Sequence, residues 1–175
     1  MRQTILVCDH SGVINSKYMT TVSPIDCLNK ALETSFDLVV VNFFGVSPSN
    51  RYLYVDLCKA LRLHALNVVA VMYVPHRALL VQLHNADVEY YEPLPAREYN
   101  TIPFEISPNQ RLTKLSDTLA DCCPMIHYIV IDEDERILCG KCNDKLVLGL
   151  RRQQEICTVK AHLGCSYFIE ECDCS

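Results

Sequence analysis

Four consecutive apolar residues, Leu38–Val41, constrain the fold of this chain more than any other stretch. The run follows Asp37 and ends at Asn42, and a turn-forming segment rich in Gly, Ser and Pro comes after it. Because three of its four residues are β-branched, this run is typical of a strand buried on both faces of a sheet. In open α/β sheets ligands bind beyond the carboxyl ends of such strands, so Asn42 is the first side chain whose chemistry needs explaining.

Similar patterns recur over the first two thirds of the chain. Short apolar runs predict strands, namely over residues 4–8, 18–22, 37–42, 66–74 and 88–91. Apolar stripes at helical spacing predict the helices that alternate with them, namely over 23–35, 51–62, 77–85 and 108–120. Ser23 followed by Pro24 is typical of a helix start. This alternation predicts βαβ units, a mostly parallel sheet and helices on both of its faces.

Composition narrows the class of protein. Half of the 175 residues are hydrophobic and 21% are charged, as in a folded domain. The net charge is −5 without a basic patch, so a nucleic-acid surface is not indicated. No apolar run reaches the roughly 18 residues of a membrane span. Residues 1–4 lead directly into the first strand pattern without a signal peptide, so we expect a cytoplasmic protein without a membrane partner.

Over about residues 4–121, the order and spacing of these elements resemble the receiver domain of bacterial two-component response regulators. The stretches that carry the resemblance are Ile5–Asp9, Ser23–Glu33, Asp37–Asn42, Val68–Met72 and Asn85–Pro93. The resemblance implies a receiver-like, flavodoxin-like α/β domain with a parallel five-stranded sheet. Residues 10–17 are too few for the usual first crossover helix, so either that helix is lost or reduced to a turn, or the second strand predicted over 18–22 is wrong.

The resemblance also implies a phosphorylation site, and this sequence departs from it at five positions: Asp9, His10, Asn42, Tyr73 and Glu92. Asn42 stands where the family has its acceptor Asp, and an amide cannot form an acyl phosphate. Asp9–His10 replaces an acidic pair, and one carboxylate is a poor Mg²⁺ site. Tyr73 falls near a Ser or Thr position, and Glu92 replaces a Lys. The resemblance therefore implies a pseudo-receiver whose Asp9, Asn42 and Glu92 either cap strand ends or form a remodelled ligand site.

Pseudo-receivers are commonly protein-interaction modules. The family uses the face formed by its fourth helix, fifth strand and last helix, which here corresponds to residues 77–92 and 109–120. The resemblance therefore implies a protein partner, or a second copy of the chain, bound at this face.

The distribution of cysteine points to a second module. Eight of the 11 cysteines lie in residues 122–175, so we place a domain boundary there, with a receiver-like domain over 1–121 and a small Cys-rich α+β module over 122–175. An odd number of cysteines without an export signal favours metal or thiol chemistry over disulfides. Within the module we expect a strand over 126–131 and a hairpin of 145–150 with 155–159. The three earlier cysteines are expected to be buried small apolar residues.

Two ligand pairs within this module have the spacing of a structural zinc site. Cys139-x2-Cys142 is followed after 19 residues by His162-x2-Cys165. The pattern resembles zinc ribbons and treble clefs, and a 54-residue module needs such a staple because its core is small. Five cysteines are left over and could replace His162, build a second site or sense oxidant: Cys122, Cys123, Cys157, Cys172 and Cys174. An iron–sulfur cluster and a redox dithiol at Cys139-x2-Cys142 are the alternatives to zinc.

The sequence contains no recognisable catalytic constellation. There is no nucleophile–base pair, no glycine-rich phosphate loop and no catalytic metal triad. We therefore expect a non-enzymatic signalling or regulatory protein that contacts a protein partner independently of phosphorylation and carries a structural zinc module. A thiol or metal redox sensor that uses the C-terminal cysteines is the alternative.

Overall fold

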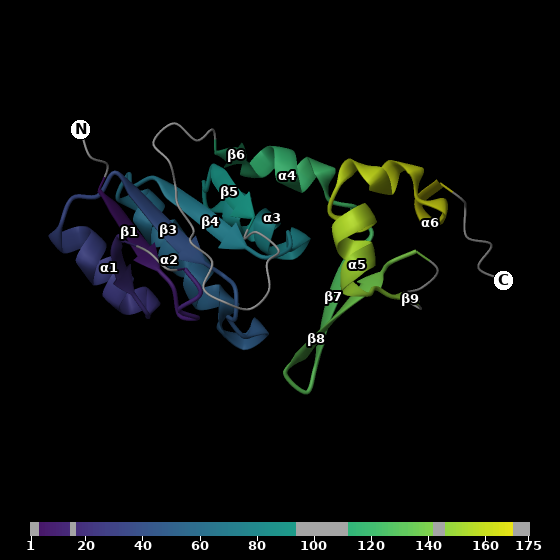
Figure 1. Cartoon of the computed structure of the whole chain (residues 1–175), viewed down its shortest axis with the longest axis horizontal. Coiled ribbons are helices and arrows are strands. Elements are labelled where there is room, and N and C mark those ends of the chain that lie inside the picture. The colour runs from purple at the N-terminus through teal and green to yellow at the C-terminus, as the bar shows by residue number, and fades with distance from the viewer. Residues whose placement is uncertain (1–3, 15–16, 94–111, 142–145, 170–175) are drawn as a thin grey trace.

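The computed structural model describes residues 4–14, 17–93, 112–141 and 146–169. The described residues form two sheets, one with six strands and one with three. Figure 1 shows them toward opposite ends of an elongated molecule, joined through α4 (Leu115–Asp121). The fold is therefore a mixed α/β domain followed by a smaller, mainly antiparallel part.

The larger sheet confirms the predicted mostly parallel α/β architecture. Its strands are β1 (Ile5–Cys8), β2 (Met19–Thr21), β3 (Leu38–Asn42), β4 (Val68–Met72), β5 (Tyr90–Pro93) and β6 (Thr113–Lys114), in the order β2-β1-β3-β4-β5-β6. Strands β1 to β5 are parallel, whereas β6 is antiparallel to β5. We predicted five strands, and the sheet has six. The additional strand, β6, has two residues and pairs with β5, which would otherwise be an exposed edge strand.

The helices of this sheet begin close to the predicted positions, except the last. They are α1 (Pro24–Glu33), α2 (Arg51–Leu63) with a preceding 3₁₀ turn η1 (Pro48–Asn50), α3 (Arg77–Asn85) and α4. Ser23 caps α1 as predicted, because its Oγ accepts a hydrogen bond of 3.1 Å from the backbone N–H of Asp26. Helix α4 begins at Leu115 rather than near residue 108, and residues 94–111 lie outside the described part.

All four helices pack on one face of the sheet, so the prediction of helices on both faces is wrong for the described residues. Leu6, Val39 and Val68 join residues of α1 to α4 in one buried cluster, whereas their neighbours Ile5 and Val40 belong to a second cluster without helical members. For α1 to α3 the reason is the direction of the connections. The crossovers into β3, β4 and β5 all step the same way across the sheet, and right-handed crossovers in one direction fall on one face.

The first connection, from β1 to β2, runs across the sheet in the direction opposite to that of the later crossovers. Its described residues, 9–14 and 17–18, contain no helix, as the short spacing predicted. The predicted second strand is present instead and pairs in parallel with β1. Ile14 is buried on the face without helices, and Tyr18 packs against the same cluster.

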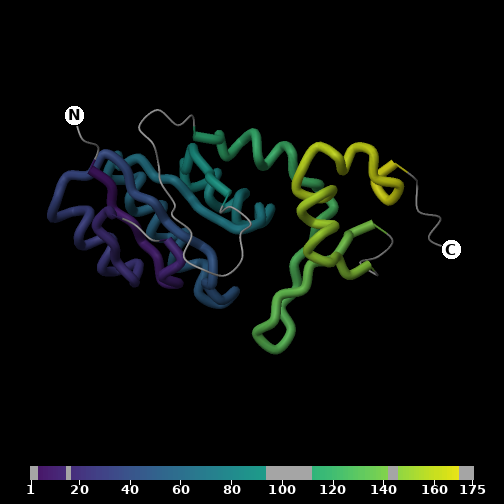
Figure 2. The backbone as a smooth tube through the Cα atoms, viewed as in Figure 1, coloured from purple at the N-terminus to yellow at the C-terminus, as the bar shows by residue number. Residues whose placement is uncertain are grey.

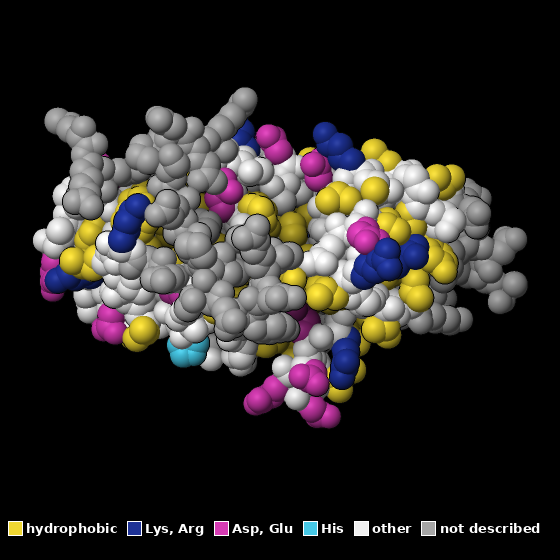
Figure 3. All heavy atoms as spheres, in the orientation of Figure 1, with side chains coloured by type: hydrophobic (Ala, Val, Ile, Leu, Met, Phe, Trp, Pro, Cys, Tyr) yellow, Lys and Arg dark blue, Asp and Glu magenta, His cyan; other side chains and the backbone are white. Residues whose placement is uncertain are grey.

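The smaller part is built on a β-hairpin. Its strands are β7 (Ile126–Ile131), β8 (Asp134–Cys139) and β9 (Leu146–Val147). Asp132 and Glu133 form the hairpin turn with φ of 50° and 70°, which a two-residue turn of this kind requires. The tip of this hairpin extends away from the rest of the chain in Figure 2, and acidic side chains gather there in Figure 3.

The described residues from Leu150 to Ile169 are mostly helical, and the predicted strand over 155–159 is wrong. The segments are α5 (Leu150–Arg152), the π-helical turn η2 (Gln153–Cys157), the 3₁₀ helix η3 (Lys160–Gly164) and α6 (Ser166–Ile169). Arg151 and Glu155 form an ion pair of 2.9 Å at the i, i+4 spacing that a helix favours. Across the described ranges, no helix combines the length and the apolar character that crossing a membrane requires.

Candidate functional site

Asp9 and Asn42 meet at the carboxyl edge of the large sheet. Because Cys8 pairs with Val41 in parallel register, the next residue of each strand lies side by side. Oδ1 of Asp9 accepts hydrogen bonds from Nδ2 of Asn42 (2.8 Å) and from the backbone N–H and Oγ of Ser11 (3.0 and 2.7 Å). Oδ2 accepts one from the backbone N–H of Ile14 at 2.8 Å. Both oxygens of this buried carboxylate are therefore used within the chain.

The amide of Asn42 is equally committed. Its Oδ1 accepts a hydrogen bond of 3.0 Å from the backbone N–H of Phe44, and its Nδ2 also contacts Oγ of Ser11 at 3.2 Å. Asn42 is fully buried and Asp9 is 1% exposed. These contacts favour the interpretation in which the two side chains cap the ends of β1 and β3, rather than the one in which they form a ligand site.

The other three positions of the degenerate phosphorylation site are not joined to this pair. His10 is exposed to solvent. Tyr73 follows β4 and its ring lies 6.1 Å from that of Phe44. Glu92 is buried on β5, with β4 between it and Asn42, and accepts a hydrogen bond of 2.9 Å from the backbone N–H of Thr113. The five positions therefore share an edge of the sheet without forming one site.

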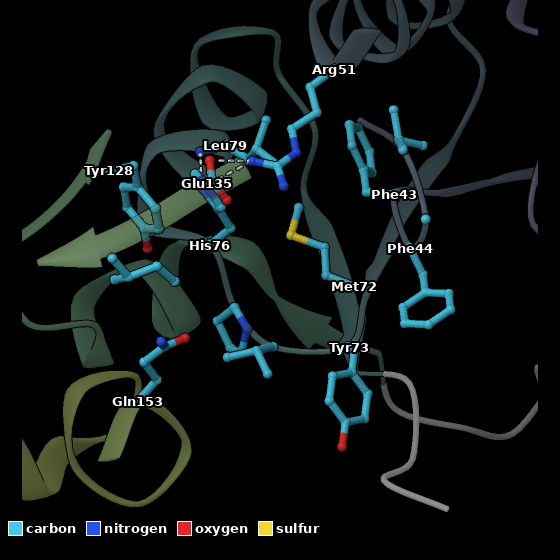
Figure 4. Close-up of a pocket in the computed structure, with 15 residues that line it drawn as sticks. Phe43, Phe44, Arg51, Met72, Tyr73, His76, Leu79, Tyr128, Glu135 and Gln153 are labelled. Atoms are coloured by element: carbon cyan, nitrogen blue, oxygen red, sulfur yellow. Dashed lines mark hydrogen bonds and ion pairs between the residues drawn. The ribbon is translucent and has the colours of Figure 1, made fainter. Parts of the chain in front are cut away.

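A pocket of about 200 Å³ lies where the β7–β8 hairpin meets the carboxyl edge of the large sheet. The ends of β3 and β4, the starts of α2 and α3, and the hairpin all contribute side chains to it, and Figure 4 shows these side chains converging from both parts of the chain. Aromatic side chains supply much of the lining, namely Phe43, Phe44, Tyr73, His76 and Tyr128. Sequence reasoning gave no sign of this junction, because no local pattern marks a contact between residues so far apart along the chain.

Glu135 of β8 is the main polar contact across the junction. Its Oε1 accepts hydrogen bonds from Nη1 of Arg51 and from Nε2 of His76, the latter at 3.1 Å (Figure 4). Burial by itself would raise the pKa of the Glu135 carboxyl, but the hydrogen bonds from His76 and Arg51 and the charge of the Arg51 guanidinium outweigh it and lower the pKa to about 2. Glu135 is therefore ionised and held between two cationic or donor groups.

His76 and Tyr128 add a second set of contacts. Nδ1 of His76 accepts a hydrogen bond of 3.2 Å from the backbone N–H of Leu79 and so caps α3, which assigns the ring hydrogen to Nε2, facing Glu135. The ring of Tyr128 stacks on that of His76 with centroids 3.7 Å apart. Its hydroxyl accepts a hydrogen bond of 2.9 Å from the backbone N–H of Arg77, and burial raises the pKa of Tyr128. The hairpin thus docks on the first turn of α3.

A second, smaller cavity of about 20 Å³ lies within the C-terminal part. Five side chains that could bind a metal line it: Cys123, Cys139, Cys157, His162 and Cys165. Burial raises the pKa of the Cys123 thiol, with Cys139 and Cys165 adding to the shift through their charges. Burial and the neighbouring Cys123 raise the pKa of Cys157 to about 11. The cavity therefore gathers thiols from segments that are distant in sequence.

Three of the four predicted zinc ligands line this cavity, namely Cys139, His162 and Cys165. Cys142 lies outside the described residues, as do Cys172 and Cys174. Within the described ranges, no three His, Cys, Asp or Glu side chains are arranged as they stand to hold a metal ion. The predicted zinc site therefore stays a prediction.

Cys123 and Cys157 are the members of the cavity that the sequence left unassigned. Neither belongs to a pair with metal-ligand spacing, so only the fold shows their place. The backbone N–H of Cys123 donates a hydrogen bond of 2.7 Å to the carbonyl of Cys157, which joins the two segments. Cys122, the neighbour of Cys123, belongs instead to the core of the large sheet.

The three N-terminal cysteines are buried in the core of the large sheet, as expected. Cys8, Cys27 and Cys58 are each fully buried there. A hydrogen bond between Cys8 and Cys27, together with burial, raises the pKa of Cys8. These thiols lie in a core apart from the cysteine-lined cavity.

Comparison with models of known protein families gave no match over this chain, and a search of curated proteins gave none either.

Proposed function

We propose that this chain is a non-enzymatic regulatory protein, in which a receiver-like domain acts without phosphorylation and contacts a protein partner. The observation that carries the proposal is the Asp9 carboxylate, whose two oxygens are occupied by four hydrogen bonds from Ser11, Ile14 and Asn42. The strand order β2-β1-β3-β4-β5 supports the receiver-like assignment, because flavodoxin-like domains share it.

The chemistry of the sheet edge supports a phosphorylation-independent role. A phosphoryl acceptor needs a free carboxylate, and Asn42 supplies an amide that is already bonded to Asp9 and Phe44. A divalent cation at Asp9 would have to displace backbone donors from both of its oxygens, which costs about 1–3 kcal/mol for each group left unpaired. Glu92 would repel a phosphate rather than attract one.

The proposed partner surface is the face formed by α3, β5 and α4. Helix α4 packs against both α3 and β5, and a polar groove of about 420 Å³ lies alongside them. Side chains of both charges line it, among them Arg62, Asp87, Glu89 and Lys114. A face that carries both signs of charge can pair with itself about a two-fold axis, so we take a second copy of the chain as the partner.

The first experiment tests phosphorylation independence. Amide spectra of the ¹⁵N-labelled full chain are recorded with Mg²⁺ and then with acetyl phosphate or beryllofluoride added. We expect no shift at Asp9, Asn42 or Phe44. A saturable shift confined to these residues would contradict the proposal, and a functional receiver domain treated identically serves as the positive control.

A second experiment tests the partner surface. Sedimentation velocity of the full chain should show a concentration-dependent dimer that the Lys114→Glu variant weakens. The matched control is Lys59→Glu, which makes the same charge change at an exposed position of α2. A monomer at all concentrations, or an equal loss of dimer in both variants, would rule out this face as the self-contact.

A thiol or metal sensor is the second candidate function, favoured by the four cysteines that line one cavity. It requires a reducing, cytoplasmic setting in which the thiols are free. Hydrogen peroxide would then join a pair of them as a disulfide, and dithiothreitol would reverse the change. A reversible change of sedimentation coefficient on oxidation supports this candidate, whereas an unchanged coefficient with fully oxidised thiols rejects it.

A further inference from the structure

Four thiols from four separate segments of the chain line one cavity. Cys123 follows α4, Cys139 ends β8, Cys157 ends η2, and Cys165 precedes α6. The backbone hydrogen bond between Cys123 and Cys157 and the hairpin pairing of Ile126 with Cys139 hold three of these segments together. The spacing of the cysteines along the sequence does not explain why they meet, because a different tertiary contact positions each thiol.

Donors and cations surround the sulfur atoms. Nη2 of Arg152 lies 3.4 Å from Sγ of Cys165 and donates to it, and the backbone N–H of Met125 donates to the sulfur of Cys123. The side chains of Arg152 and Lys141 both line the cavity. Four thiolates around a divalent cation carry a net charge of −2, and hydrogen bonds to sulfur together with two nearby cations offset that charge.

The size of the cavity decides what could occupy it. A cavity of about 20 Å³ has room for about one water molecule, and its walls include Leu148, Ile156 and Phe168. A single ion fits such a space. An iron–sulfur cluster, with several iron and sulfide atoms, would require the apolar walls to move apart.

His162 is the fifth side chain with ligand chemistry that lines the cavity. Its Nδ1 lies 2.9 Å from the carbonyl oxygen of Val159, and its ring packs edge-on against Phe168 with centroids 5.3 Å apart. A hydrogen bond from Nδ1–H to this carbonyl leaves the lone pair of Nε2 available to a metal, but four thiolates already complete the four-coordinate shell of a structural zinc site. The described thiols are not arranged to hold an ion as they stand, so binding would require their side chains to change rotamer.

We propose that Cys123, Cys139, Cys157 and Cys165 bind one zinc ion as a four-thiolate site. Each thiol gives its proton to solvent as its sulfur bonds to the metal, so that one Zn²⁺ replaces up to four protons. The inference deepens the proposed function by defining the ligands of its metal module, and it assigns Cys123 and Cys157 where the sequence pattern assigned Cys142 and His162. The ion would tie together a small core built around Cys123, Ile126, Leu148 and Cys157, which is too small to be stable by apolar burial alone.

The test uses the full chain, purified without oxygen and without added metal, then dialysed against Zn²⁺. We expect about one tightly bound zinc per chain in the wild type, and at least a roughly fivefold lower content in Cys123→Ser and in Cys157→Ser. Two controls should keep the zinc. Cys122→Ser makes the same change one residue away in the other core, and His162→Asn removes the ring that the sequence pattern favoured.

Cobalt provides a second measurement that does not depend on the variants folding. Co²⁺ bound to the wild type should give the thiolate-to-metal charge-transfer absorption of four sulfur ligands in a tetrahedral field. Several outcomes would overturn the proposal. Among the variants, these are full zinc content in both Cys123→Ser and Cys157→Ser, or loss of zinc in His162→Asn. In the wild type, they are a cobalt spectrum of fewer thiolates, bound iron with sulfide, or no tightly bound metal. The phosphorylation experiment measures Asp9 and Asn42, which belong to the other sheet. The zinc proposal and the proposed function can therefore fail independently of each other.

Discussion

Nδ2 of Asn42 donates a hydrogen bond of 2.8 Å to Oδ1 of Asp9, across the carboxyl ends of the two central strands β1 and β3. The amide satisfies a buried carboxylate that a second carboxylate at the same position would repel. The amide at position 42 therefore stabilises this edge of the sheet.

Asn42→Asp tests this relationship directly. Two adjacent buried carboxylates repel each other and lose one hydrogen bond, so we expect about 2–3 kcal/mol less stability at pH 7 in urea unfolding. The pair can share one proton as the pH falls, because the folded-state pKa of the pair is raised. The loss should therefore shrink at pH 5. Asn67→Asp, an exposed amide at the start of β4, should cost less than about 1 kcal/mol, and equal losses in both variants would contradict the prediction.

Glu135 should make stability depend on pH. Its pKa of about 2 lies below the ordinary value of 4.5, so its contribution is present above pH 4.5 and is lost as the pH falls toward 2. We expect Glu135→Gln to be about 2 kcal/mol less stable than the wild type at pH 6 and equal to it near pH 2, by urea unfolding. The control Glu155→Gln alters an exposed pair with Arg151 and should change stability little at either pH. A constant difference across this range would contradict the assignment of Glu135.

Tyr128→Phe removes the hydroxyl that accepts from the backbone N–H of Arg77 but retains the ring that stacks on His76. The unpaired N–H should lower the free energy of unfolding by about 1–2 kcal/mol. Hydrogen exchange at Arg77 should become faster, and this is the measurement that separates docking of the hairpin from general destabilisation. Tyr52→Phe, at an exposed position of α2, should leave that amide unchanged.

The described cysteines should differ sharply in reactivity in the metal-free, reduced chain. Cys139 and Cys165 are partly exposed, whereas Cys58 and Cys122 are buried. Burial raises the pKa of Cys58 and raises that of Cys122 to about 12, so few thiolates form at pH 8. Alkylation with iodoacetamide, mapped by mass spectrometry, should modify the first pair quickly and the second only through unfolding. Equal rates for Cys58 and Cys139 would contradict the packing.

Strand β8 links the cysteine-lined cavity to the junction, because Glu135 and Cys139 lie four residues apart on it. A strand spans about 3.4 Å per residue, and its paired backbone moves largely as one unit, so fixing Cys139 also fixes Glu135. Zinc added to the metal-free chain should therefore slow exchange of the Arg77 amide by roughly tenfold, since it stabilises the docked hairpin. The amide of Phe43, which donates to Val71 inside the large sheet, should be unaffected. An unchanged Arg77 rate at full zinc occupancy would show that cavity and junction are independent.

Much of the fold was predictable from local patterns. The strands β1, β3 and β4 lie within the predicted apolar runs, and Ser23 caps α1 as its position predicts. Periodicity and capping involve neighbours along the chain, so the sequence carries them directly. The segment over 155–159 was misjudged because a short apolar stretch is ambiguous between helix and strand, and the ion pair of Arg151 with Glu155 accompanies the helix.

The sequence by itself determined the α/β architecture and the amide at Asn42, because residue identity and apolar periodicity are local properties. Only the tertiary structure decided that four helices share one face, that Glu135 meets Arg51, and that Cys123 and Cys157 join Cys139. These contacts join segments tens of residues apart. Their partners depend on the order of the strands and on how the hairpin packs against the sheet, and no spacing in the sequence records either.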